Sequence, residues 1–82
     1  MREVSDLYVT ALLRLRGHEP KRVVGDGRRC TWHFDSTPAL EADLSAYHDG
    51  TMQVSVRDFS EVLRSVKGQA IHVAREVMAR TR

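Results

Sequence analysis

The sequence VRDFSEVLRSVKGQAIHVAREVMAR, residues Val56–Arg80, decides the fold because it carries the longest helical pattern in the chain. Its apolar side chains recur at alternating steps of four and three residues, which keeps them on one side of a helix. The members of this stripe are Phe59, Leu63, Val66, Ala70, Val73 and Val77. Ser55 followed by Asp58 forms a capping box at its start. The sequence therefore predicts one long C-terminal helix against which the shorter elements pack.

Two shorter helices are predicted before it. Ser5 is expected to cap the first, which ends at Gly17 because glycine accepts the left-handed conformation that stops a helix. Thr37 and Pro38 provide the cap and first-turn proline of the second. That helix is expected to end before Asp49-Gly50.

A β-hairpin is predicted in RVVGDGRRCTWHF, residues Arg22–Phe34. Asp26-Gly27 between two strand-like runs indicates a type I′ turn, which places Val23 opposite Cys30. In this register one face holds Cys30, Trp32 and Phe34 and forms the core, and the other holds Arg29, Thr31 and His33 with Arg22 and Val24. We expect this second face, His33 included, to be exposed.

The β-prone segment Thr51–Val54 is predicted to add a short third strand, giving the order α-β-β-α-β-α. The expected fold is α+β, with an antiparallel hairpin and a third strand packed against three helices on one face. The 82 residues are expected to form one small domain, residues 1–82, with residues 68–82 as a helical extension.

The composition excludes several classes of protein. Cys30 is the only cysteine, so an internal disulfide and a multi-cysteine zinc site are impossible, and a lone cysteine is typical of a reducing compartment. The N-terminal residues lack the long apolar run of a signal peptide, and no stretch is apolar enough to span a membrane. We expect a cytoplasmic protein with no membrane partner.

Catalysis is not predicted, because the reactive residue types are few and poorly placed. Cys30 and His33 lie three apart on a strand and so point to opposite faces. The glycine-rich Gly25-Asp26-Gly27 lacks the Lys-Ser/Thr of a phosphate loop and leads into a strand. The other histidines, His18, His48 and His72, fall on separate elements and lack the close spacing of metal ligands. We expect no catalytic residues, metal site or cofactor.

Three segments, SDLYVTALLRLRGHE, GDGRRCTWHF and YHDGTMQVSVRDFSEVLRSVK, are together similar to a small bacterial family of domains of unknown function. The resemblance covers roughly residues 5–67. It implies a first helix with S-D-L-Y near its start and R-G-H at its end, a D-G-R-R hairpin and a helix ending in L-R-x-x-K. It also implies a bacterial source and a setting in phage-like or mobile elements. Family members tend to stop soon after Lys67, whereas this chain continues to Arg82.

Nucleic-acid binding is the first functional hypothesis. The net charge is only +2, but basic residues concentrate in residues 14–29 and from residue 57 onward, and residues 30–56 hold no Lys or Arg. At about 100° per residue Arg57, Arg64, Arg75 and Arg82 align opposite the apolar stripe. The candidate nucleic-acid-binding residues are Arg22, Arg28, Arg29, His33, Arg57, Arg64, Lys67 and Arg75. The alternative is a solvated helix face, with Glu61 paired to Arg57 or Arg64.

Protein–protein assembly is the second hypothesis. After Gly68 the apolar arc of the long helix widens to about 160°, more than one small domain can cover. The candidate interface residues are Ala70, Ile71, Ala74, Val77 and Met78. The alternative is that the extension folds back and completes the core of its own chain. We therefore predict a non-catalytic accessory module that contacts DNA, RNA or a nucleic-acid-processing complex, with a self-assembling or protein-interaction module using the C-terminal helix as the alternative.

Overall fold

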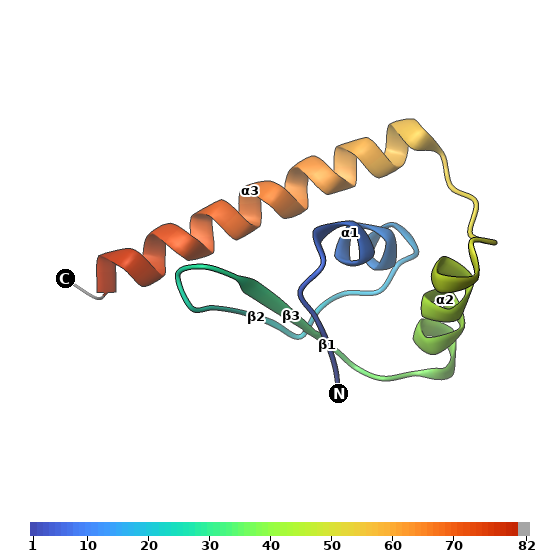
Figure 1. The fold of residues 1–82 in the computed structure, drawn as a ribbon, viewed down its shortest axis with the longest axis horizontal. Coiled ribbons are helices and arrows are strands. Elements are labelled where there is room, and N and C mark those ends of the chain that lie inside the picture. The colour runs from blue at the N-terminus through green and yellow to red at the C-terminus, as the bar shows by residue number, and fades with distance from the viewer. Residues whose placement is uncertain (81–82) are drawn as a thin grey trace.

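The computed structural model describes residues 1–80 and shows an α+β fold in which three antiparallel strands carry helices on one face (Figure 1). The elements, in chain order, are β1 (Arg2–Val4), α1 (Leu7–Leu15), β2 (Arg22–Gly25), β3 (Cys30–Phe34), α2 (Pro38–Asp49) and α3 (Val56–Arg80). The α+β class, the three helices and the long C-terminal helix are confirmed. The position of the third strand along the chain is not.

The third strand is β1, at the N-terminus, and not the segment Thr51–Val54. The sheet order is β1-β3-β2, and Val4 of β1 lies opposite Trp32 of the central strand. Residues 51–54 instead join α2 to α3, and the N–H of Thr51 donates to the carbonyl of Ala46 at 2.9 Å. The N–H of Met52 also donates to Ala46, at 3.3 Å, so the first two N–H groups of the segment are turned towards α2 and not towards a strand.

The hairpin forms as expected, but its register is shifted by two residues. Gly25 pairs with Cys30 and Val23 with Trp32, so the loop is Asp26–Arg29. A type I′ turn needs two residues with positive φ, and only Gly27 of this loop has one, at 91°. The Asp26 carboxylate accepts from the N–H groups of Arg28 and Arg29 at 2.9 and 2.8 Å, which stabilises the longer loop.

A shift of two residues leaves each side chain on its predicted face. Cys30, Trp32 and Phe34 are therefore buried on the core face, as expected. His33 was expected to be exposed, and this is wrong, because the side chain is only 6% exposed. The addition of β1 explains the difference: His33 now lies on the central strand between Glu3 and Arg22.

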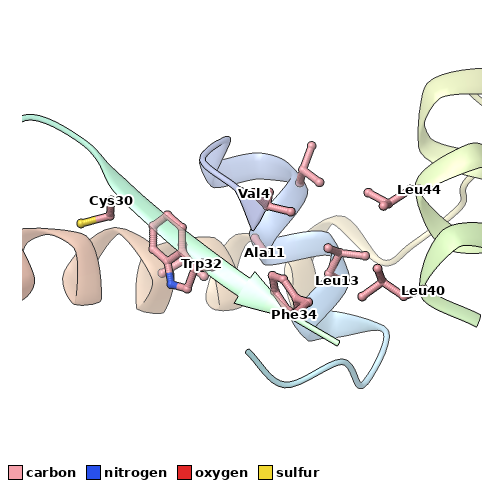
Figure 2. Close-up of a cluster of buried hydrophobic side chains, with 10 residues drawn as sticks. Val4, Ala11, Leu13, Cys30, Trp32, Phe34, Leu40 and Leu44 are labelled. Atoms are coloured by element: carbon pink, nitrogen blue, oxygen red, sulfur yellow. The ribbon is translucent and has the colours of Figure 1, made fainter. Parts of the chain in front are cut away.

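The core is built around α1, which packs against α3 and α2, and Figure 2 shows the buried side chains of this cluster. Ala11 and Leu13 of α1 meet Trp32 and Phe34 of β3 in one buried cluster with Leu40, Leu44 and Val66. The cap of α1 is Asp6 and not Ser5: its carboxylate accepts from the N–H groups of Tyr8 and Val9. Ser5 instead forms a hydrogen bond with Thr31 at 3.0 Å. The predicted N-terminal cap of α2, Thr37, is confirmed; the helix includes Asp49, one residue more than expected, and ends at Gly50 in the left-handed conformation.

Helix α3 runs along α1 and continues over the hairpin (Figure 1). At its start the N–H of Asp58 donates to the Ser55 hydroxyl at 3.3 Å. Beyond Gly68 the helix is held by its own domain, because the Trp32 indole N–H donates to Gln69 Oε1 at 2.9 Å. The Cys30 thiol donates to the carbonyl of Ala70 at 3.5 Å. No helix in residues 1–80 is both long and apolar enough to cross a membrane.

Candidate binding surfaces

The outer side of α3 carries Arg57, Arg64 and Arg75, and Lys67 lies to one side of them, about 80° round the helix; the sequence singled out all four. All four are exposed, and within residues 1–80 none lies in an ion pair. Glu61 lies one turn from both Arg57 and Arg64 but pairs with neither. Arg82, the fourth aligned arginine of the sequence prediction, lies outside the described residues. The row therefore presents positive charge that the described part of the domain does not neutralise.

The hairpin cations lie elsewhere. Arg22 is opposite His33 on the sheet face away from α1 and α3, and Arg28 and Arg29 belong to the loop. Because the apolar side of α3 faces the sheet, Arg57, Arg64 and Arg75 point away from it, and the face with Arg22 is on the other side of the molecule. The structure therefore does not bring Arg22 together with the α3 arginines. His33 is enclosed, with Nδ1 3.6 Å from Glu3 Oε1, and is poorly placed to contact a polyanion.

The candidate interface residues divide between two sides of α3. Val77 faces the hairpin: a Cβ added at Gly25 would lie 3.6 Å from its Cγ2. Ala70 packs against the buried core. Ile71 and Met78 are 53% and 58% exposed, and they flank the half-buried Ala74 on one side of the helix. The chain's own domain thus covers one edge of the predicted arc, at Ala70 and Val77. The other edge, the margin that carries Ile71 and Met78, stays exposed.

A groove of about 320 Å³ separates this exposed margin from the hairpin loop. It is lined by Ser5, Leu7, Gly27, Arg28, Arg29, Cys30, Trp32, Ala70, Ile71 and Ala74. Two candidate cations and three candidate interface residues therefore meet in one place. Sequence reasoning missed this convergence because it required the longer loop, which carries Arg28 and Arg29 towards α3.

The electrostatics of the loop are set by Asp26. Hydrogen bonds from the N–H of Arg28, then from that of Arg29, lower the pKa of the Asp26 carboxyl. Burial, and to a smaller extent the Asp26 charge, raises the pKa of the Cys30 thiol. Cys30 is therefore a neutral side chain of the groove floor at physiological pH, because a raised pKa disfavours the thiolate.

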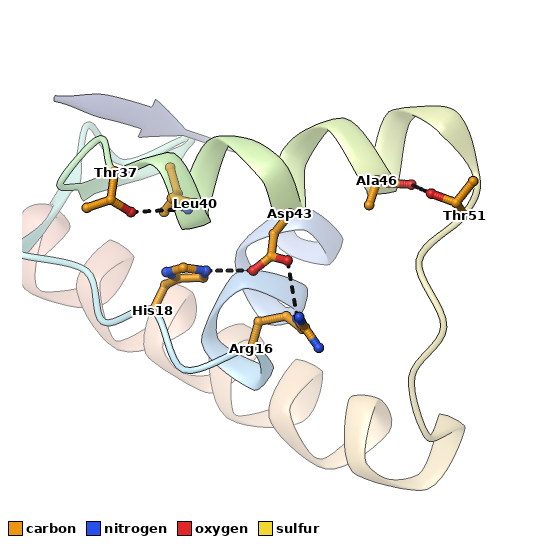
Figure 3. A network of polar contacts seen from close by, with 7 residues as sticks. All are labelled: Arg16, His18, Thr37, Leu40, Asp43, Ala46 and Thr51. Carbon is orange, nitrogen blue, oxygen red and sulfur yellow. Dashed lines mark hydrogen bonds and ion pairs between the residues drawn. The ribbon is translucent and has the colours of Figure 1, made fainter.

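The other polar cluster joins α2 to the end of α1 (Figure 3). Asp43 Oδ2 lies 2.7 Å from His18 Nε2, and Asp43 Oδ1 accepts from Arg16 Nε at 3.3 Å. No serine, threonine or cysteine is bonded to this His18 among the described residues, so the cluster has no nucleophile to activate. In residues 1–80 no three His, Cys, Asp or Glu side chains gather as metal ligands.

No protein-family model, curated protein or solved structure matches this chain. The resemblance to a bacterial family of domains of unknown function stays a prediction.

Proposed function

We propose that this protein is a non-catalytic binding module that contacts the phosphate backbone of nucleic acid through the outer side of α3. The observation that carries the proposal is the row of exposed cations without ion pairs in the described chain, Arg57, Arg64, Lys67 and Arg75. Cations that have no carboxylate partner in their own protein are free to neutralise phosphates.

The length of the row suits a duplex. Arg57 and Arg75 are eighteen residues apart, about 27 Å along a helix, which is about eight steps of duplex at 3.4 Å each. Stacking on unpaired bases is not expected, because Trp32, the side chain best suited to it, is fully buried. Binding should therefore depend on charge and salt and be indifferent to base sequence.

The test is the salt dependence of binding to a fluorescein-labelled DNA duplex of about twenty base pairs, measured by anisotropy. If the four cations neutralise four phosphates, a plot of the logarithm of the association constant against the logarithm of the salt concentration should have a slope near −3.6. This corresponds to about a 150-fold loss of affinity between about 50 and 200 mM salt. The double variant Arg57→Gln, Arg64→Gln should lower the slope to about −1.8.

Arg22→Gln is the matched control, because it removes an exposed cation from the opposite face and should leave the slope unchanged. Glu61→Gln should strengthen binding, since it removes an unpaired carboxylate from beside the row. A slope that does not respond to the α3 variants, or no binding at low salt, would refute the proposal.

A protein-binding role is the second candidate, favoured by the apolar groove beside Ile71. Light scattering separates its two forms. A dimer of the intact chain that Ile71→Asp dissociates would indicate self-assembly through the exposed margin of α3, whereas a monomer leaves the groove to a different protein.

A further inference from the structure

The groove between the hairpin loop and α3 ends at an open edge of β3. On one side β3 is paired up to Cys30, by Gly25 of β2. On the other side its last partner is Val4, opposite Trp32, because the chain then leaves the sheet to begin α1 at Leu7. Among the described residues no backbone hydrogen bond joins Asp6 to Cys30, which would lie opposite each other two positions further along that register.

The backbone groups of Cys30 point towards this open edge. The N–H of Asp26 donates to the carbonyl of Arg29 at 3.2 Å, so Arg29 directs its backbone groups to the β2 side. Hydrogen-bonding direction alternates along an antiparallel strand, so Cys30 directs its own groups to the β1 side. An extended segment that continues the line of β1 can therefore bond to Cys30, as strands do when they add to a sheet edge.

The two faces of such a segment would meet different surroundings. On the core face lie Leu7, Ile71 and Ala74, which form apolar walls. On the opposite face lie Thr31 and, by alternation from Cys30, the side chain of Arg29. Side chains of an extended segment also alternate between faces, so a period of two with apolar residues inward matches the groove.

The charges around the groove favour acidic residues at the alternate, outward-facing positions of such a segment. Arg28 and Arg29 line it, and Lys67 lies one helical turn before Ile71 on α3. None of these three cations has an ion pair in the described part of the chain. The neighbouring carboxylates of Asp26 and Asp6 already accept backbone N–H groups of the loop and of α1.

From the open edge, the apolar walls and the unpaired cations, we infer that the groove binds an extended segment of a partner protein in which apolar and acidic residues alternate. The groove shares only Lys67 with the α3 row, and the inference does not depend on nucleic-acid binding. An acidic partner is favoured over nucleic acid here because the floor and walls are apolar.

The probe is the fluorescein-labelled hexapeptide Val-Glu-Val-Glu-Val-Glu, with binding followed by anisotropy. Two control peptides are Glu-Glu-Glu-Val-Val-Val, which has the same composition without the alternation, and Val-Lys-Val-Lys-Val-Lys. The alternating acidic peptide should bind saturably and at least about tenfold more tightly than either control. Only this peptide places valines against the apolar walls and carboxylates near the groove cations at the same time.

Three protein variants locate the site. Arg28→Glu with Arg29→Glu, and separately Ala74→Glu, should each weaken binding about tenfold or more, the first by charge and the second by obstruction. Arg22→Glu is the control, because Arg22 begins β2 at the end of the hairpin away from the loop. Circular dichroism of each variant shows whether it is folded. If Ala74→Glu does not fold, the Arg28→Glu, Arg29→Glu variant still tests the site, because both arginines are exposed.

Amide shifts in a ¹H–¹⁵N titration supply the second readout, and the largest should fall on Cys30 and on Ile71–Ala74. The inference would be overturned if Glu-Glu-Glu-Val-Val-Val bound as tightly as the alternating acidic peptide, or if the loop variants left binding unchanged. Amide shifts confined to other residues would also overturn it. So would a DNA duplex that shifts these same amides while the acidic peptide does not.

Discussion

Substitution of Gly25 by alanine should destabilise the domain, because α3 packs closely on the sheet at this position. An added Cβ would lie 2.6 Å from Val73 Cγ1, and a β-branched valine has little freedom to move away. Overpacking of this kind costs about 1–3 kcal/mol, and the lower entropy of the unfolded alanine chain returns about 0.4–1 kcal/mol. With the overpacking cost at the middle of its range, about 2 kcal/mol, the net loss should be about 1–1.6 kcal/mol, or about 4–13 °C in Tm for a domain of this size.

The assay is urea unfolding followed by the fluorescence of Trp32, the only tryptophan. Val73→Ala by itself should also lower the unfolding free energy. The double variant Gly25→Ala, Val73→Ala should nevertheless be more stable, by about 1 kcal/mol or more, than the sum of the two single losses predicts. Gly68→Ala is the matched control: its Cβ would meet nothing within 4 Å, and it should stabilise α3 by about 0.5–1 kcal/mol. A neutral Gly25→Ala, or additive losses in the double variant, would refute the close contact.

Two further predictions concern polar groups. Because the folded pKa of Asp26 is lowered, its contribution to stability is present above the unfolded pKa and is lost as pH falls through the folded value. Asp26→Asn should therefore flatten the unfolding free energy measured between about pH 5 and pH 2, and an unchanged pH profile would contradict the loop geometry. Asp43→Ala should lower the unfolding free energy in urea by about 1–3 kcal/mol, because it leaves the half-buried His18 without its partner, and a loss no larger than that of the exposed Ala42→Gly would count against this contact.

Much of the fold could be predicted from local chemistry. Thr37-Pro38, Gly50 and Ser55 mark helix ends because caps depend on the residues themselves, and the structure places them as expected. The stripe from Phe59 to Val77 likewise depends only on the helical period. The face of Trp32 and Phe34 was predicted correctly in spite of the wrong register, since a shift of two residues does not change side-chain direction.

What could not be predicted depends on contacts between distant segments. β1 is only three residues long and has polar residues on either side of its single buried valine, so no periodicity distinguishes it from a disordered end. Its pairing with β3 encloses His33, which the hairpin alone would have left exposed. The groove depends in turn on the loop length and on the path of α3, and neither is encoded in a local motif.

The central claim is that α3 lies along its own domain up to Val77, which leaves its cations outward and closes one wall of the groove. Hydrogen exchange of the α3 amides tests this directly when compared at about 10 μM and about 500 μM protein, because mass action would reveal protection that comes from a second copy. We predict that the amides of residues 69–77 are protected to a similar degree as that of Val66, equally at both concentrations. Rapid exchange of residues 69–77 in the dilute sample, with protection only in the concentrated one, would contradict the account.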